Sequence, residues 1–123
     1  MVACREVIKM KTGVLLVNLG TPDSYEPRDV YKYLVEFLTD PRVIDLPYLK
    51  RQFLVRSVIA PLRFLTSAKS YKAIWSKEGS PLLVYGQKVK DLLQQALGDE
   101  YFVEIAMRYQ NPSIKSAIDI LEK

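Results

Sequence analysis

The chain has 123 residues and a net charge of +4, from 18 lysines and arginines against 14 aspartates and glutamates. This length fits one domain, and dispersed basic residues without an aromatic-basic RNA motif or zinc-ligand spacing argue against a nucleic-acid partner. Because Cys4 is the only cysteine and histidine is absent, the chain cannot form an internal disulfide or zinc site, and a cytoplasmic setting is expected.

Residues 1–11 are expected to be an extension that precedes the folded part. Met1 to Lys9 lack the apolar core of a secretory signal, and a second methionine, Met10, follows directly. No apolar run approaches the roughly 20 residues that cross a bilayer. We therefore expect the fold to occupy residues 12–123.

The first predicted element is a strand at residues 14–17 (Val-Leu-Leu-Val), followed by Asn-Leu-Gly-Thr-Pro-Asp at 18–23. Four apolar residues that run into glycine and proline are typical of a buried parallel strand. Open α/β sheets bind ligands in the crevice outside the carboxyl ends of their strands. Residues 18–21 are therefore the first candidate site, although Gly20 could also serve only the geometry of a tight turn.

Helices are predicted next, from the spacing of apolar residues. An amphipathic helix begins near Pro27 and ends before Pro41, because proline disfavours helical geometry in the residue before it. A basic amphipathic helix is expected from 49 to 60, broken by Pro61, and another from 67 to 75. The stretch from about 46 to 79 is longer than one crossover requires, so we expect it to stand off the sheet.

A long amphipathic helix is predicted between Ser80, as its N-cap, and Gly98, followed by a strand at 101–107 and a last helix that starts at Pro112. Two strands separated by helices imply a parallel pair whose carboxyl ends share one edge. Residues 18–21 and 108–109 are therefore predicted to form one site. A doubly wound sheet usually has more strands, which indicates a fragment or a partner-dependent piece.

Four motifs, in this order, resemble the amino-terminal part of ferrochelatases, lyases that insert ferrous iron into a porphyrin in the last step of haem synthesis. They lie at 14–23, 40–47 (Asp-Pro-Arg-Val-Ile-Asp-Leu-Pro), 78–82 (Glu-Gly-Ser-Pro-Leu) and 107–112 (Met-Arg-Tyr-Gln-Asn-Pro). The resemblance covers about residue 12 to the end. It implies a chelatase-like α/β fold, flavodoxin-like and Rossmann-type, with a parallel sheet flanked by helices and an incomplete first domain.

The resemblance also implies which residues bind substrate. It places 18–21 at the floor of the porphyrin cleft, where Gly20 lets a ring approach the backbone, and gives the porphyrin carboxylates an arginine anchor. Some family members have a tyrosine that can reach the metal at the position of Leu19; leucine offers only packing and favours protoporphyrin as substrate. The implied substrate-binding residues are Asn18, Leu19, Gly20, Thr21, Arg63, Tyr71, Ser80, Arg108 and Tyr109.

Each of these side chains also has an ordinary structural interpretation. Arg63 and Arg108 could be solvated surface residues, Tyr71 could face a core, and Ser80 could only cap a helix. The histidine base and the acidic residues of the family chemistry lie later in the chain, so no catalytic or metal-binding residue is predicted here. The segment alone is expected to be inactive, with the remainder of the chain as its partner.

The substrates that the resemblance implies are Fe²⁺ and protoporphyrin IX, with no resident cofactor assigned. Residues 46–64 correspond to a lip of the cleft that can touch the membrane, which would make the protein peripherally membrane-associated; the alternative is an amphipathic helix packed on the domain. A different class of function also stays open. The chain could be a non-catalytic α/β module that binds a planar ligand or a protein through the same edge of the sheet.

Overall fold

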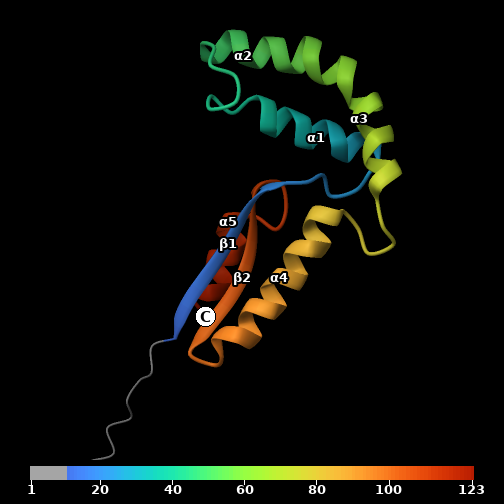
Figure 1. The fold of residues 1–123 in the computed structure, drawn as a ribbon. Coiled ribbons are helices and arrows are strands. Elements are labelled where there is room, and N and C mark those ends of the chain that lie inside the picture. Colours follow the sequence, from blue (N-terminus) through green and yellow to red (C-terminus); the bar gives the residue numbers. More distant parts are fainter. Residues whose placement is uncertain (1–10) are drawn as a thin grey trace, which may run out of the picture.

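The computed structural model describes residues 11–123 and has two parts, a sheet with helices on both faces and a layer of helices beyond one end of the sheet (Figure 1). Most of the predicted extension, residues 1–10, lies outside the described part. The sheet consists of β1 (Thr12–Gly20) and β2 (Tyr101–Tyr109).

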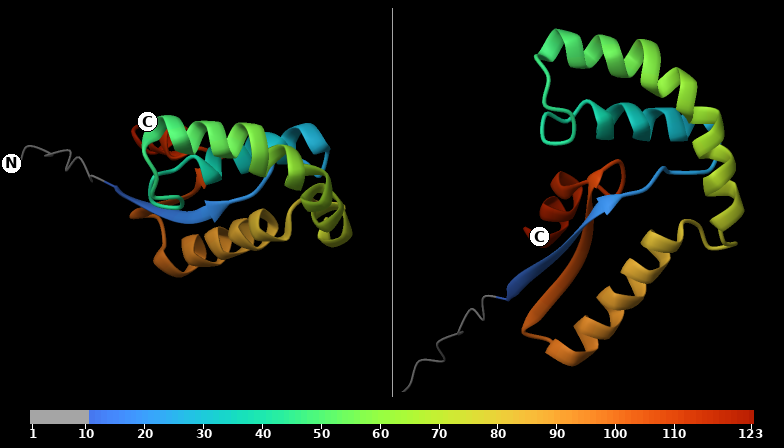
Figure 2. Two further views of the ribbon diagram at one scale, coloured as in Figure 1. Left: turned by 90° about the horizontal axis from the view of Figure 1, so that it is seen from above. Right: turned by 45° about the horizontal axis from the view of Figure 1, so that its top comes forward.

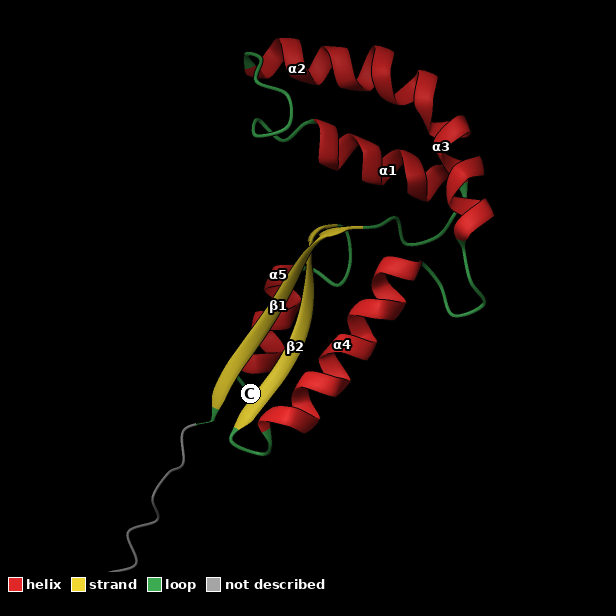
Figure 3. Cartoon of the chain, viewed as in Figure 1, coloured by secondary structure: helices red, strands yellow, loops and turns green. Residues whose placement is uncertain are grey.

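The two strands are parallel, with Thr12 opposite Tyr101 and Gly20 opposite Tyr109. The prediction of a parallel pair whose carboxyl ends share one edge is therefore confirmed. Helices α4 (Pro81–Leu97) and α5 (Ile114–Leu121) cover opposite faces of this sheet (Figure 2), and the arrangement is the predicted α/β class (Figure 3).

The ends of α4 and α5 follow from local sequence. Pro81 occupies the first turn of α4, and Gly98, with φ of +81°, ends it. Helix α5 starts two residues later than predicted, because Ser113 is its N-cap and accepts a hydrogen bond from the Ser116 N–H at 3.1 Å.

The second part, which we call the helical layer, contains α1 (Pro27–Leu38), α2 (Tyr48–Leu54), the π-helical turn η1 (Val55–Ile59) and α3 (Ala60–Ile74). The prediction that Pro61 breaks the helix was wrong, since α2, η1 and α3 follow one another without interruption. In η1 the Ala60 N–H bonds to the Val55 carbonyl, five residues back. This wider turn accommodates a residue that has no N–H and whose ring would clash with a regular α-helical turn.

Each part has its own apolar core. In the helical layer Val30, Val55 and Ala60 are fully buried; in the sheet the buried residues are mostly on β2, where Val103 and Met107 are at most 2% exposed. Strand β1 is less covered than a central strand, with Val17 53% and Leu19 49% exposed. The physical reason is that α4 and α5 pack mainly against β2, so they cover less of β1.

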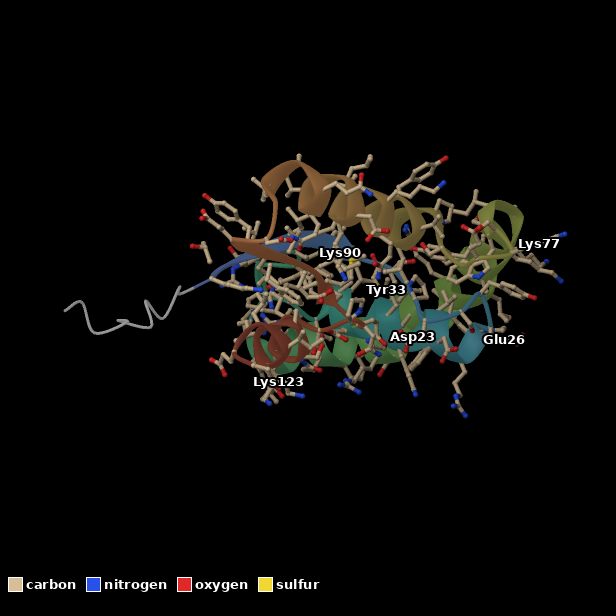
Figure 4. All side chains as sticks on the ribbon, turned by 90° about the horizontal axis from the view of Figure 1, so that it is seen from below. Asp23, Glu26, Tyr33, Lys77, Lys90 and Lys123 are labelled. Atoms are coloured by element: carbon tan, nitrogen blue, oxygen red, sulfur yellow. The ribbon has the colours of Figure 1, made fainter. Side chains whose placement is uncertain are left out.

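Aromatic rings connect the helical layer to the sheet. Tyr33 of α1 stacks on Phe37 at 5.9 Å between ring centroids, and Phe37 meets Tyr109 of β2 edge-on at 5.2 Å. In Figure 4 Tyr33 lies toward the middle of the molecule, whereas Glu26 and Lys77 lie at its periphery. Edge-on and stacked pairs at these separations are favourable, so the rings help hold α1 against the end of β2.

Candidate functional site

The candidate site lies at the edge of the sheet where both strands end, which we call the rim: residues 18–21, at the end of β1 and directly after it, and residues 108–109 of β2. Gly20 has φ of +136°, and a Cβ there would lie 2.5 Å from the Tyr109 carbonyl oxygen. The backbone of β2 therefore occupies the space beside Gly20. This close approach gives the glycine a structural requirement of its own, whatever ligand the rim accepts.

Two buried hydroxyls fix the turn after β1. The Thr21 hydroxyl donates to the Ser80 Oγ at 2.7 Å, and these residues are 3% and 4% exposed. Ser80 stands at the N-cap position of α4, but its side chain makes no capping hydrogen bond to that helix. The sequence therefore predicts correctly that Ser80 begins the helix. Its side chain, however, bonds to Thr21 at the rim and does not cap the helix.

Asp40 joins the helical layer to the end of β2. Its Oδ2 accepts hydrogen bonds from the Tyr109 hydroxyl at 2.7 Å and from Arg108 Nη2 at 3.1 Å, while its Oδ1 accepts from the Arg42 N–H at 2.8 Å. The Tyr109 hydrogen bond, then that of Arg42, holds the pKa of Asp40 below its ordinary value. Burial and the same carboxylate raise the pKa of Tyr109. Asp40 is thus an ionised acceptor for a neutral phenol and a guanidinium.

The loop that follows β2 is tied down by two further side-chain contacts. Gln110, which has φ of +63°, donates from its backbone N–H to Glu36 at 3.2 Å and from its side-chain amide to the same carboxylate. Asn111 donates to Asp23 in the turn after β1, at 3.2 and 3.3 Å to its two oxygens. Both loops at the rim are therefore held in place by residues that the sequence did not single out as site residues.

Arg63 and Tyr71 lie on α3, in the helical layer, and not on the rim itself. Arg63 is exposed. Tyr71 is half-buried, and its ring centroid lies 6.2 Å from that of Tyr33 and 6.4 Å from that of Trp75. Burial raises the pKa of Tyr71, and burial together with Tyr71 raises that of Tyr33. Both phenols are therefore neutral near pH 7, and the exposed cations of this helix are Arg63, Lys69 and Lys72.

A hollow of about 230 Å³ lies between the sheet and α4 and reaches the rim at Asn18. Its other walls are apolar and include Val17, Tyr85 and Val89, each more than half exposed. The Asn18 side chain itself accepts from the Leu19 N–H at 2.8 Å. A flat apolar ligand placed along this side of β1 would cover hydrocarbon and meet the polar group of Asn18 at the strand end.

The nine predicted residues divide by their exposure. Those that a ligand can reach are Asn18, Leu19, Arg63 and Arg108; Tyr71 is half-buried; Gly20, Thr21, Ser80 and Tyr109 are buried. Residues 18–21 and 108–109 come together with Ser80 at the rim. Within residues 11–123 the acidic side chains form no group of three that could hold a metal ion.

The fold is that of an α/β protein with a parallel sheet, a class in which ligands commonly bind outside the carboxyl ends of the strands. The family model named Ferrochelatase matches residues 11–123. Ferrochelatases from Haemophilus influenzae (strain PittEE) and Legionella pneumophila (strain Corby) are 53% and 51% identical over 116 and 109 residues, which are 92% and 89% of this chain but 36% and 33% of those proteins. A ferrochelatase from Coxiella burnetii (strain Dugway 5J108-111) is 48% identical over 113 residues, covering 92% of this chain and 32% of that protein.

The chain belongs to the ferrochelatase family, and it spans about a third of the length of the curated relatives it matches. None of the helices in the described part of the chain combines the length and hydrophobicity needed to cross a membrane.

Proposed function

We propose that this chain is the amino-terminal part of a complete ferrochelatase that inserts Fe²⁺ into protoporphyrin IX. The observation that carries the proposal is the rim, where Asn18 to Thr21 and Arg108 to Tyr109 meet at the carboxyl ends of two parallel strands. Family membership supports it. In the complete protein the rim supplies one wall of the porphyrin site, and the remainder of the chain supplies the base that takes up the pyrrole protons.

The chemistry of the substrate explains the residues that are exposed. A porphyrin is a flat apolar ring with carboxylate side chains, so its binding site needs hydrocarbon walls and cations at the edge. Leu19 and the hollow beside β1 provide hydrocarbon. Arg63 provides a planar guanidinium whose N–H donors can pair bidentately with a carboxylate. Within residues 11–123, no acidic side chain lies within ion-pair distance of Arg63.

Substitution of Arg63 tests the proposal in the complete protein. Arg63→Ala should weaken binding of protoporphyrin IX at least about tenfold, because a hydrogen bond to a charged group contributes about 1.5–3 kcal/mol. Binding of the dimethyl ester, which lacks the carboxylates, should not change. Arg28→Ala, an exposed arginine of α1, is the matched control. Binding and iron insertion are followed through the Soret band.

The outcomes separate the two classes of function. Unchanged protoporphyrin affinity of Arg63→Ala contradicts the role of this arginine. Saturable binding of protoporphyrin without iron insertion by the complete wild-type protein contradicts the enzyme and favours the non-catalytic binding module. Absence of both binding and insertion contradicts the porphyrin site altogether.

We also propose that α2, η1 and the start of α3 contact the membrane surface from the cytoplasmic side. Leu49, Phe53 and Leu62 are 79%, 69% and 75% exposed, and basic residues lie among them. Exposed apolar side chains with interleaved lysine and arginine are typical of a helix that lies in a membrane interface. A hydrophobic substrate would then enter the site from the lipid.

Flotation with vesicles tests this contact. The complete protein should float with vesicles of phosphatidylcholine and phosphatidylserine, and the double variant Phe53→Ser, Leu62→Ser should not. The matched control is Tyr85→Ser, Leu92→Ser on α4, where the same kind of change is made at side chains that are each 65% exposed. Equal loss of flotation in both double variants would show that general hydrophobicity, and not the helical layer, causes membrane association.

A further inference from the structure

Asp40 is the residue through which the helical layer reaches the end of β2. It follows α1 directly after Thr39, and its two partners at the rim, Arg108 and Tyr109, are 68 and 69 positions further along the chain. The side chain of Asp40 is only 5% exposed. A buried carboxylate is unfavourable unless it is hydrogen-bonded and paired, and here both Oδ atoms accept hydrogen bonds.

Tyr109 and Arg108 are held by this carboxylate in different ways. The Tyr109 hydroxyl points inward and donates to Asp40. Tyr109 therefore does not present its hydroxyl to a ligand at the rim. The guanidinium of Arg108 lies 5.4 Å over the Tyr109 ring and its side chain is 46% exposed. Asp40 takes one of its five N–H donors, and the exposed remainder of the fork faces solvent at the rim.

The neighbouring cation does not have the same role. Arg42 reaches Asp40 with its guanidinium only at 3.9 Å, and its side chain is 76% exposed. A long, exposed pair of this kind contributes little. Its backbone N–H supplies the bond to Oδ1 instead. The close side-chain contacts of Asp40 are therefore those with Arg108 and Tyr109.

We propose that Asp40 is a positioning residue: its buried carboxylate fixes the guanidinium of Arg108 and the ring of Tyr109 beside Gly20, so that the free donors of Arg108 meet the substrate at the rim. This inference rests on the proposed iron insertion. In that reaction Asp40 acts through Arg108 and does not itself touch the substrate. Small displacements of a positioning group reduce rates strongly, about a hundredfold for about 1 Å.

A double-mutant cycle in the complete protein tests the inference. Asp40→Asn keeps the shape of the side chain and removes its charge, and Arg108→Lys keeps the charge and removes the fork. Each variant should lower kcat/KM for iron insertion by up to about a hundredfold, and the double variant should be no worse than the poorer single variant, because both changes remove the same arrangement. The control is Glu36→Gln, a carboxylate that holds the adjacent Gln110 but makes no bond to Arg108.

Two outcomes would contradict the positioning role of Asp40. Effects of Asp40→Asn and Arg108→Lys that multiply in the double variant would overturn the inference, as would a loss in Glu36→Gln equal to that in Asp40→Asn. Thermal unfolding of each variant is recorded in parallel. Where Asp40→Asn fails to fold, Tyr109→Phe replaces it in the cycle with Arg108→Lys. Tyr109→Phe removes the hydroxyl that donates to Asp40.

A second readout is independent of catalysis. In the ¹⁵N-labelled complete protein, the guanidinium signal of Arg108, assigned by its loss in Arg108→Lys, should move to the position of a free arginine in Asp40→Asn and stay in place in Glu36→Gln. An unmoved signal in Asp40→Asn overturns the positioning role. A wild-type protein that neither binds protoporphyrin nor inserts iron contradicts the proposed function, while the signal of Arg108 still decides whether Asp40 fixes it.

Discussion

Replacement of Gly20 by alanine should destabilise the protein more than replacement of any other glycine at positive φ. Two effects add at this position. A φ of +136° is strained for a residue with a side chain, which costs about 1–3 kcal/mol. The new Cβ would also lie 2.5 Å from the Tyr109 carbonyl oxygen and 3.1 Å from its Cβ, and overpacking of this kind costs about 1–3 kcal/mol more.

The chain contains controls that separate the two effects. Gly79 has φ of +122° and nothing within 4 Å of an added Cβ, so Gly79→Ala carries the backbone strain alone, about 1–3 kcal/mol. Gly13, without a positive φ, would place a Cβ at an ordinary 3.4 Å from Leu121, and its substitution should change stability by about 1 kcal/mol or less. Gly20→Ala should therefore total about 2–6 kcal/mol.

Urea unfolding of the complete protein, followed by circular dichroism, gives the free energy of unfolding for the three variants. The destabilisation of Gly20→Ala minus that of Gly79→Ala gives the cost of the close contact with Tyr109, which we expect to be about 1–3 kcal/mol. Equal destabilisation of these two variants would refute the argument, because it would show that β1 and β2 do not approach each other closely at the rim.

Two further predictions concern buried polar groups. Thr21→Val should destabilise the protein by about 1–3 kcal/mol, because it leaves the buried Ser80 hydroxyl without its partner; Thr21→Val with Ser80→Ala should recover part of this loss in urea unfolding, and a further loss would contradict the pairing. Asp40, which faces Arg42, Arg108 and Tyr109, has a pKa lowered by folding, so its contribution to stability is complete above the ordinary pKa of an aspartate and is lost as the pH falls through the lower, folded value. The stability gap between wild type and Asp40→Asn in urea should therefore be constant near neutral pH and shrink in acid; a gap that persists unchanged into strong acid would contradict it.

The elements of this fold are readable from the sequence because each is specified locally. Pro27 and Pro81 start helices, Gly98 ends one, and an apolar run followed by glycine marks the end of β1. The helix break predicted at Pro61 is absent for a local reason that the spacing of apolar residues does not reveal. A π-helical turn shifts the hydrogen-bond pattern by one residue, and a proline that would end a regular helix is then tolerated within it.

The contacts that shape the rim are not readable in the same way, because their partners are distant in sequence. Asp40 contacts Tyr109 across 69 positions, and Asn111 contacts Asp23 across 88. Asp40 does fall within one of the motifs that suggested the family, so the sequence signals that the residue matters. It carries no information on whether the residue binds a ligand, holds a neighbour or ends a helix.

This distinction determines how substitutions at the rim should be interpreted. Gly20 and Tyr109 are buried and lie close to each other, so a change at either should displace the strand ends and lower both stability and binding of the proposed ligand. Leu19 and Arg63 are exposed and pack little of the protein, so a change at either should lower binding while the free energy of unfolding stays nearly constant. The ratio of the two effects should thus separate residues that contact the proposed porphyrin from residues that only hold their neighbours in place. Arg108, which is 46% exposed and bonded to Asp40, should fall between the two groups.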